Sequence, residues 1–429
     1  RFTAALMAGR VFKHPGTLAA ALVVPPAERA GGSFMHSAQG VSLTDLDGQD
    51  FIDLTGSYGV NVFGADFYRA SMAEAPCRAA PLAATLGQYH PAVAFNVKEL
   101  RRISGQEEVS FHMSGTEAVM QAVRLARYHS KKRKIVRFTG AYHGRTMMTL
   151  GLTGKVVPYS AGMGLMPGGI FRAQYPCALH GVSTDDAIAS IERIFKNDAE
   201  PKDIAAIIIE PVQGEGGFYV APKDFMQRLR ALCDQHGILL IADEVQTGAG
   251  RTGTFFAMEQ MGVAADLTTF AKSIAGGFPV AGVCGKAEYM DAIAPGGLGG
   301  TYAGSPIACA AALAVMQVFE EEKLLDRCKA VGERLVTGLK AIQAKHNAVG
   351  EVRALGAMIA MELCEGGDVH KPNAALTGQI VAKARDKGLI LLSCGTYGNV
   401  LRVLVPLTAE DALLDRGLAI IAECFDELA

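Results

Sequence analysis

The hydrophobic pattern near the start of the chain has a period of two. Residues 41–46 alternate apolar and polar side chains, and residues 51–54 resume this pattern after Asp47 and Gly48. An Asp-Gly pair between two alternating segments is typical of a tight hairpin turn. We therefore predict a β-hairpin over residues 41–54.

Further along the chain, short apolar runs alternate with helical stretches. Residues 204–209 and 238–242 are almost continuously apolar, which is typical of strands buried on both faces of a parallel sheet. Between these runs, apolar residues within 225–232 recur at helical spacing. The same spacing predicts a helix over residues 117–129, and residues 135–138 form a strand-like run. This β–α–β order predicts a doubly wound α/β domain.

The chain is long enough for a large domain and a smaller one. Its 429 residues are too many for one compact core. An alanine-rich helix is predicted over residues 306–322, where the chain leaves the large domain. Short strands are predicted at residues 389–392 and 401–405, between helices. We predict that the large domain covers residues 76–320, and that residues 1–75 and 321–429 together form the small domain.

Composition and charge argue against several classes of function. Half the residues are hydrophobic and the formal net charge is −2, so no strong field attracts nucleic acid or an anionic membrane. No apolar run reaches the ~18 residues that a membrane-spanning helix needs. The 9 cysteines show neither a Cys-x-x-Cys pair nor zinc-type spacing. This pattern favours a cytoplasmic protein with reduced thiols and no metal site.

The N-terminal segment is basic. Its first 27 residues contain Arg1, Arg10 and Lys13 but no acidic residue, which gives it some similarity to an organelle transit peptide. We favour instead a basic arm that packs on the body of the protein. Because the chain begins with Arg, we expect the native start to lie upstream.

A buried strand that ends at Asp243, followed by Lys272 before the small residues 275–277, indicates a cofactor site. Ligands of open α/β sheets bind at the carboxyl ends of the strands. Pyridoxal phosphate (PLP) needs a lysine amine for a Schiff base and a carboxylate beside its protonated pyridine nitrogen. Either residue alone would be interpreted as a capping aspartate or a surface lysine. Together they favour a PLP enzyme.

Four stretches carry a specific resemblance to a known family: LTGK at 152–155, IEPVQGEGG at 209–217, LIADEVQTGAGRTG at 240–253 and GGTYAG at 299–304. The chain resembles the class III (subgroup II) PLP-dependent aminotransferases, most specifically the bacterial 4-aminobutyrate and 5-aminovalerate aminotransferases. The resemblance is continuous from about Arg145 to the C-terminus. It implies PLP as cofactor and the α/β fold called fold-type I, with a large, mostly parallel, doubly wound sheet and a small α+β domain.

The resemblance also assigns cofactor-binding residues. Gly115 and Thr116 match phosphate-binding positions, and a glycine turn at a helix N-terminus suits a phosphate, although Ser114 and Glu117 also have capping-box spacing. Tyr142 matches the residue that stacks on the cofactor ring, with a core aromatic as the alternative. The remaining matches are His143, Asp243, Val245, Gln246 for the phenolic oxygen, Lys272, and Thr301 donated across a dimer interface. This last match implies a homodimer or homotetramer.

Three further matches concern the substrates. Arg145 matches the arginine that holds the carboxylate of an ω-amino acid, and Arg402 matches the one that binds the α-carboxylate of glutamate. Glu215 matches the residue that covers Arg402 when the ω-amino acid is bound, because an unpaired cation beside a methylene is costly. Without the match, Arg402 would be interpreted as part of a surface salt bridge. Glu210 is assigned to the catalytic group as a support.

The implied reaction is a ping-pong aminotransfer. The amino group of 4-aminobutyrate or 5-aminovalerate moves to 2-oxoglutarate, giving the semialdehyde and glutamate. Lys272 acts as general base and acid, with Asp243 as its catalytic partner.

The N-terminal third departs from this pattern. Residues 113–127 look more like glutamate-1-semialdehyde aminomutases and the aminotransferase modules of polyketide and nonribosomal peptide synthases, so the chain resembles a mosaic. Tyr58 faces the substrate where 4-aminobutyrate enzymes usually have Ile and ornithine aminotransferases have Tyr. The alternatives are an aminomutase, an ornithine-type aminotransferase and a non-catalytic PLP-fold protein. The set of Arg145, Glu215 and Arg402 argues against a mutase, which needs no second amino acceptor.

Overall fold

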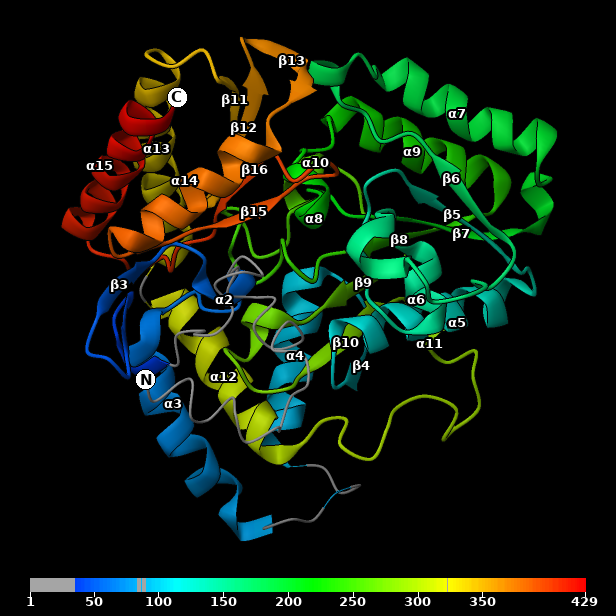
Figure 1. Cartoon of the computed structure of the whole chain (residues 1–429). Helices are drawn as coiled ribbons and strands as arrows, with labels where there is room; N and C mark the ends of the chain where they lie inside the picture. Colours follow the sequence, from blue (N-terminus) through cyan, green and yellow to red (C-terminus); the bar gives the residue numbers. More distant parts are fainter. Residues whose placement is uncertain (1–34, 83–85, 87–89, 322) are drawn as a thin grey trace.

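The computed structural model describes residues 35–82, 86, 90–321 and 323–429 (Figure 1). The basic arm predicted for the first 27 residues lies outside this described part. Among the helices described, none combines the length and the apolar character that crossing a membrane requires.

The centre of the molecule is a seven-stranded sheet. From edge to edge its strands are β4 (Glu108–His112), β10 (Ala281–Gly285), β9 (Leu267–Phe270), β8 (Leu239–Asp243), β7 (Ile204–Ile209), β5 (Lys134–Phe138) and β6 (Ile170–Ala173). Strand β10 runs antiparallel to β4 and β9, and the other neighbouring strands of this sheet are parallel. The predicted doubly wound α/β architecture is confirmed.

Helices cover both faces of this sheet (Figure 1). Ile207 and Ile209 of β7 pack in one apolar cluster with α7 (Thr184–Asn197) and α9 (Lys223–His236). The alternate residue Ile208 packs in the opposite cluster with α5 (Gly115–Ser130). Every residue of β7 and β8 is buried, because the side chains of a strand alternate between two covered faces. This burial explains the continuous apolar runs in the sequence.

Two smaller sheets bring the chain ends together. The predicted hairpin is confirmed as β2 (Ser42–Asp45) and β3 (Asp50–Asp53), with β1 (Met35–Gln39) beside β2 and with β14 (Leu389–Ile390) pairing parallel to β3. The other sheet has the order β11 (Val349–Leu355), β12 (Met358–Glu365), β16 (Val400–Val403), β15 (Leu392–Cys394), and β13 (Asp368–Pro372) pairs with β12. The strand predicted at 389–392 is therefore wrong in one respect, since its two ends belong to different sheets.

The remaining helices surround these sheets. The longer ones are α3 (Gly64–Ala79), α4 (Pro91–Ser104), α12 (Pro306–Glu321), α13 (Leu324–Gln343), α14 (Ala374–Asp386) and α15 (Asp411–Leu428), and the short ones are α2 (Gly56–Gly59), α6 (Met147–Leu152), α8 (Gly214–Gly217), α10 (Met258–Met261) and α11 (Ala287–Met290). The predicted domain limit at residue 76 falls inside α3, and the limit at 320 falls near the end of α12. The limits themselves stay a prediction.

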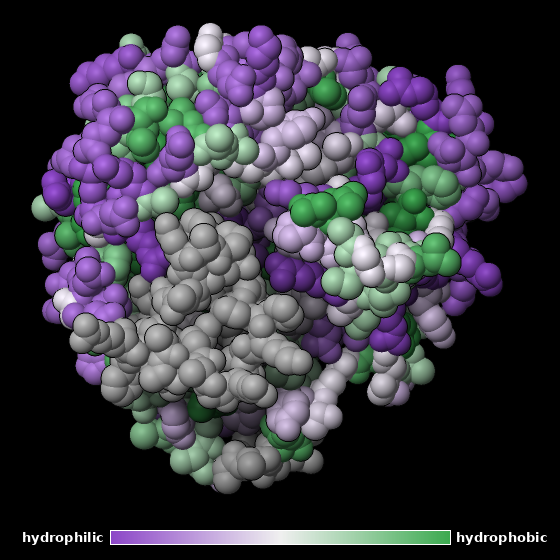
Figure 2. Space-filling view, in the orientation of Figure 1, coloured by the Kyte–Doolittle hydropathy of each residue, from purple (hydrophilic) through white to green (hydrophobic). Residues whose placement is uncertain are grey.

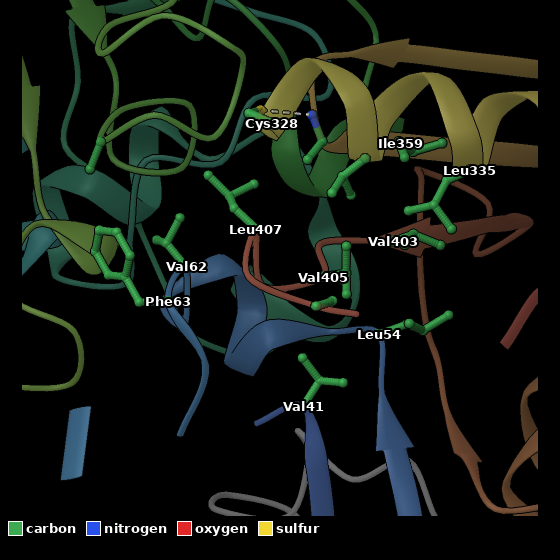
Figure 3. Close-up of a cluster of buried hydrophobic side chains, with 14 of the residues drawn as sticks. Val41, Leu54, Val62, Phe63, Cys328, Leu335, Ile359, Val403, Val405 and Leu407 are labelled. Atoms are coloured by element: carbon green, nitrogen blue, oxygen red, sulfur yellow. Dashed lines mark hydrogen bonds between the residues drawn. The ribbon is translucent and has the colours of Figure 1, made fainter. Parts of the chain in front are cut away.

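One apolar core joins the N-terminal and C-terminal segments (Figure 3). Its members from the two segments include Val41, Leu54, Val62, Phe63, Leu335, Ile359, Val403, Val405 and Leu407. Hydrophilic side chains are prominent along the upper and right-hand edges of the face shown in Figure 2. The first described strands therefore fold as part of the C-terminal body.

Arg251 ties this body to the large sheet. Its side chain is fully buried, and its guanidinium donates to the carbonyl oxygens of Val405 (2.5 Å), Asn61 (3.4 Å), Gly59 and Ala357. Among the described residues no carboxylate forms an ion pair with it, and burial lowers its pKa to about 10. The cation is held by peptide carbonyls from both chain ends.

We predict that Arg251→Met lowers the free energy of unfolding by about 3 kcal/mol or more, because it leaves several buried carbonyl groups without a donor. Urea denaturation of the holoenzyme measures the change. The control is Arg334→Met, which breaks exposed ion pairs with Asp411 and Asp415 and should cost less than about 1 kcal/mol. Equal losses in the two variants would contradict this role for Arg251.

Candidate active site

A cleft of about 870 Å³ opens where strands β7 and β8 end. It brings together all but one of the residues predicted for the site: Tyr58, Gly115, Thr116, Tyr142, His143, Arg145, Glu210, Glu215, Asp243, Val245, Gln246, Lys272 and Arg402. The exception is Thr301, which is exposed and does not line the cleft of this single chain. Within the described residues, no group of three His, Cys, Asp or Glu side chains is arranged to hold a metal ion.

Asp243 is the last residue of β8 and is held in a fixed orientation. Its Oδ2 lies 2.7 Å from Nδ1 of the buried His143, and its Oδ1 accepts from the Thr269 hydroxyl (3.1 Å) and the Val245 backbone N–H (3.2 Å). Because both carboxylate oxygens are engaged, the side chain cannot rotate freely. A fixed carboxylate at this place suits pairing with a cationic ring nitrogen.

Lys272 follows the end of β9 in an unusual backbone conformation. Its φ is 48°, in the left-handed region that non-glycine residues rarely adopt. Such strained residues cluster at functional sites. Among the described residues, none hydrogen-bonds its amine, and burial lowers its pKa although Asp243 and Glu215 act in the opposite direction. The amine is therefore available for covalent chemistry.

The glycine turn before α5 is both a helix cap and part of the cleft. The Ser114 hydroxyl accepts from the Glu117 N–H (3.3 Å), so Ser114 caps the helix, whereas Glu117 Oε2 accepts from the Met113 N–H (2.9 Å) instead of completing the capping box. A Cβ at Gly115 would meet Val245 Cγ1 at 2.8 Å, so only glycine fits there without movement. The Thr116 hydroxyl accepts from the Arg145 N–H (3.2 Å). The N-terminus of α5 presents its free N–H groups beside these residues, as an anion site requires.

Glu210 joins two loops of the cleft. Its Oε2 accepts from the Tyr142 N–H (2.9 Å), and its Oε1 accepts from the Gly214 N–H (3.0 Å). Burial raises its pKa to about 7, although the nearby His143 acts against this rise. Glu210 therefore links the loop that carries Tyr142 to the loop that carries Glu215 by one hydrogen bond to each, as expected for a supporting residue.

Glu215 and Arg402 form an ion pair inside the cleft. Arg402 Nη1 lies 2.5 Å from Glu215 Oε1, and the Arg402 side chain is only 4% exposed. Burial opposes the charge on Glu215, yet Arg402 holds the pKa of this carboxyl below its usual range. The Tyr58 ring lies 5.3 Å from the Arg402 guanidinium, and the backbone carbonyl oxygen of Tyr58 accepts from the Gln246 side chain. Glu215 therefore occupies Nη1 of the Arg402 guanidinium.

Arg145 lies at the exposed mouth of the cleft against two tyrosines. Its guanidinium lies 5.0 Å from the Tyr159 ring and 5.8 Å from the Tyr142 ring. The Tyr159 hydroxyl donates to Glu215 Oε2 (3.0 Å), and Lys155 donates to the Gly395 carbonyl oxygen nearby (2.9 Å). Tyr159 is a cleft residue that no sequence motif indicated. The only available signal was its place shortly after the LTGK motif at 152–155.

Comparison with known proteins places this geometry in a family. The family model described as aminotransferase class-III matches residues 24–425. The 5-aminovalerate aminotransferase DavT of Pseudomonas putida is 67% identical over 400 residues, which cover 92% of this chain and 94% of that protein. The 4-aminobutyrate aminotransferase GabT of Escherichia coli is 59% identical over 399 residues, or 92% of this chain and 93% of that protein. These alignments include most of the N-terminal third, whose likeness to aminomutases stays an untested interpretation.

Solved structures agree with the fold. An amine transaminase from an uncultivated Pseudomonas species, in a PLP-bound form, superimposes with a TM-score of 0.88 at 29% identity. The match covers 98% of this chain and 99% of that one. The predicted fold-type I architecture is therefore confirmed. The chain belongs to the class-III aminotransferases, and pyridoxal phosphate is its cofactor.

Proposed function

We propose that this chain transfers the amino group of 5-aminovalerate or 4-aminobutyrate to 2-oxoglutarate, giving the corresponding semialdehyde and glutamate. The observation that carries the proposal is the Glu215–Arg402 pair, located in the same cleft as Lys272 and Arg145. An enzyme that alternates between an ω-amino acid, which has no α-carboxylate, and glutamate, which has one, needs an arginine for that group. A glutamate that pairs with this arginine neutralises it when the ω-amino acid is bound. The names of the relatives at 67% and 59% identity support the same two ω-amino acids.

The residues of the cleft fit PLP. Gln246 Oε1 and His143 Nε2 are buried without a partner among the described residues, and buried polar atoms are normally satisfied. When bound, PLP supplies an electron sink for charge that develops on the substrate carbon. In our proposal the residues that hold it are Lys272 through its amine, Asp243 at the pyridine nitrogen, Gly115 and Thr116 at the phosphate, Tyr142 at the ring face, and His143, Val245 and Gln246 around the ring.

The remaining chemistry belongs to side chains of the protein. Lys272 Nζ takes a proton from the amine-bearing carbon of the substrate and later returns one, and its lowered pKa favours the neutral form that a base requires. Asp243, oriented by His143, would keep the pyridine nitrogen of bound PLP protonated. Glu210 holds the loop of Tyr142 and the loop of Glu215 in fixed positions relative to each other.

Two arginines select the substrates. Arg145 holds the carboxylate far from the reacting carbon, which both the ω-amino acid and glutamate possess. Arg402 binds the α-carboxylate of glutamate or 2-oxoglutarate, and Glu215 neutralises it when the ω-amino acid occupies the cleft. An aminomutase needs no second amino acceptor and hence no such pair, so this alternative is less favoured, as is an ornithine-type enzyme.

We further propose a cytoplasmic homodimer or homotetramer in which Thr301 of the partner subunit completes the phosphate site. Thr301 is exposed in the single chain. The segment beside the cleft exposes several large apolar side chains, and such patches mark protein interfaces: Met147, Val156, Val157, Met163 and Leu165. A formal net charge of −2 gives no attraction to nucleic acid or to an anionic membrane surface.

A half-reaction tests the proposed function. Holoenzyme is mixed with 5-aminovalerate or 4-aminobutyrate without a keto acid, and the semialdehyde is quantified. We expect about one equivalent per subunit, followed by about one equivalent of glutamate when 2-oxoglutarate is added, because the amino group is stored between the two steps. Continuous isomerisation of glutamate-1-semialdehyde without 2-oxoglutarate would support an aminomutase, and no semialdehyde from either amine would overturn the substrate assignment.

Substitutions of Arg402 and Arg145 should have different effects on the KM values of the two substrates. We predict that Arg402→Met raises the KM for 2-oxoglutarate about 100-fold and leaves the half-reaction with 5-aminovalerate nearly unchanged, because a lost charged pair costs about 2–3 kcal/mol. Arg145→Met should raise the KM of both substrates, because both have the distal carboxylate. Identical patterns in the two variants would contradict these roles.

A further inference from the structure

Glu215 lies at the tip of a loop whose backbone is closed on itself. The loop follows β7, and Val212 and Val220 form an isolated antiparallel bridge at its base. Within the loop, the Gln213 N–H donates to the Tyr219 carbonyl oxygen (3.0 Å) and the Phe218 N–H donates to that of Gln213 (2.7 Å). The loop therefore has a defined shape independent of its contact with Arg402.

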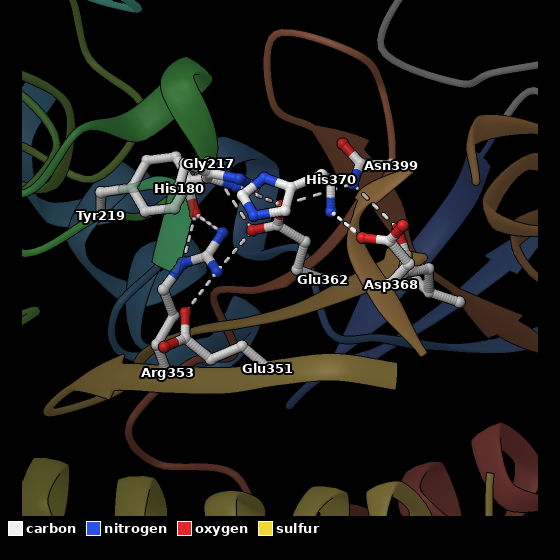
Figure 4. Close-up of polar contacts among 10 residues, drawn as sticks. His180, Gly217, Tyr219, Glu351, Arg353, Glu362, Asp368, His370 and Asn399 are labelled. Atoms are coloured by element: carbon white, nitrogen blue, oxygen red, sulfur yellow. Dashed lines mark hydrogen bonds and ion pairs between the residues drawn. The ribbon is translucent and has the colours of Figure 1, made fainter. Parts of the chain in front are cut away.

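The sheet that contains β11 and β12 contacts this loop near its tip (Figure 4). Arg353 on β11 donates through Nε to the Gly217 carbonyl oxygen (2.8 Å) and lies 4.0 Å from the Tyr219 ring. Arg353 is itself fixed by an ion pair of 2.6 Å with the buried Glu362. These contacts attach the end of α8 to the small sheet.

A second contact fixes the backbone of Glu215 itself. The Gly395 N–H donates to the Glu215 carbonyl oxygen (3.0 Å), and the Gly395 carbonyl oxygen accepts from Lys155 (2.9 Å). With the backbone held at Gly217 and at Glu215, uncovering Arg402 requires rotation of the Glu215 side chain alone.

The Glu215 carboxylate has two side-chain partners, one on each oxygen. Arg402 binds Oε1, and the Tyr159 hydroxyl donates to Oε2. Burial and the neighbouring carboxylate raise the pKa of Tyr159 above its ordinary value, so the phenol stays protonated and can donate. Rotation of Glu215 therefore breaks a second charged hydrogen bond besides the one to Arg402.

We propose that Tyr159 is a specificity-determining residue whose hydroxyl holds Glu215 in the position that covers Arg402. It thereby sets the fraction of molecules in which Arg402 is open to an α-carboxylate. This inference rests on the proposed function. It also connects the two carboxylate sites, because the Tyr159 ring packs against Arg145 while its hydroxyl binds Glu215.

The expected effect follows from the population of the open state. Loss of one hydrogen bond to a charged group shifts such an equilibrium about tenfold. When the open state is minor, the apparent affinity of a ligand that needs it rises in proportion to its population. The affinity of a ligand that binds the covered state changes little, because that state is already dominant.

The test uses holoenzyme of the Tyr159→Phe variant, which keeps the ring against Arg145 and removes only the hydroxyl. Dissociation constants are measured by calorimetry for glutarate, which has two carboxylates, and valerate, which has the same length and one. We expect the Kd of glutarate to fall about fivefold to tenfold, and that of valerate to change less than about twofold. The KM for 2-oxoglutarate should fall in parallel.

Two controls make the result specific. Tyr289→Phe removes a phenol that lies beside Glu288 and does not line the cleft, and it should leave both dissociation constants unchanged. In a Glu215→Gln background, Tyr159→Phe should produce a much smaller further change in glutarate affinity, because the two residues act through one contact.

The proposal is overturned if glutarate affinity is unchanged in Tyr159→Phe, if glutarate and valerate shift by the same factor, or if the effect persists fully in the Glu215→Gln background. Failure of the proposed function is distinguishable, because the wild-type enzyme would then not transfer amino groups from an ω-amino acid to 2-oxoglutarate. Equal urea midpoints of wild type and variant establish that the comparison is made between folded proteins.

Discussion

The ion pair between Glu215 and Arg402 is the interaction on which the substrate selection proposed for this cleft depends. A guanidinium as buried as that of Arg402 needs a counter-charge, because an unpaired buried cation is costly. Glu215 supplies that charge, and we propose that a substrate α-carboxylate replaces it. In this proposal one cation accepts two occupants of the cleft without remaining uncompensated in either state.

The fold creates this pair by joining distant segments. Glu215 lies on a loop after the central strand β7, whereas Arg402 lies on β16 of the C-terminal sheet, and the Tyr58 ring beside it comes from the N-terminal segment. Arg251 and the core shared by both chain ends keep these segments in place. Asp243 ends β8 and Lys272 lies two residues beyond the end of β9, so the central sheet positions both residues, whereas the Glu215–Arg402 pair joins a loop of the central sheet to the C-terminal sheet.

Much of this could be predicted from the sequence, for physical reasons that can be named. Strands β7 and β8 are buried on both faces, so their apolar runs are unmistakable, and Asp243 ends one of them. The family motifs indicated the residues around the predicted cofactor and the two arginines, but not Tyr159, which stands in an irregular stretch where no periodicity indicates a side-chain direction. The split of residues 389–392 between two sheets, and the contact of Arg353 with Gly217, depend on tertiary packing that local pattern does not encode. Thr301 does not line the cleft of the single chain, and its predicted place across a dimer interface stays a prediction.

A crystal structure of the holoenzyme with glutarate bound tests the proposed exchange of carboxylates at Arg402. We expect one glutarate carboxylate to contact Arg402 and the other to contact Arg145, the Glu215 side chain to have rotated away, and the Gly217 carbonyl oxygen still to accept from Arg353. An intact Glu215–Arg402 pair with glutarate bound in the cleft, or a Glu215 loop detached from Arg353, would rule out this exchange.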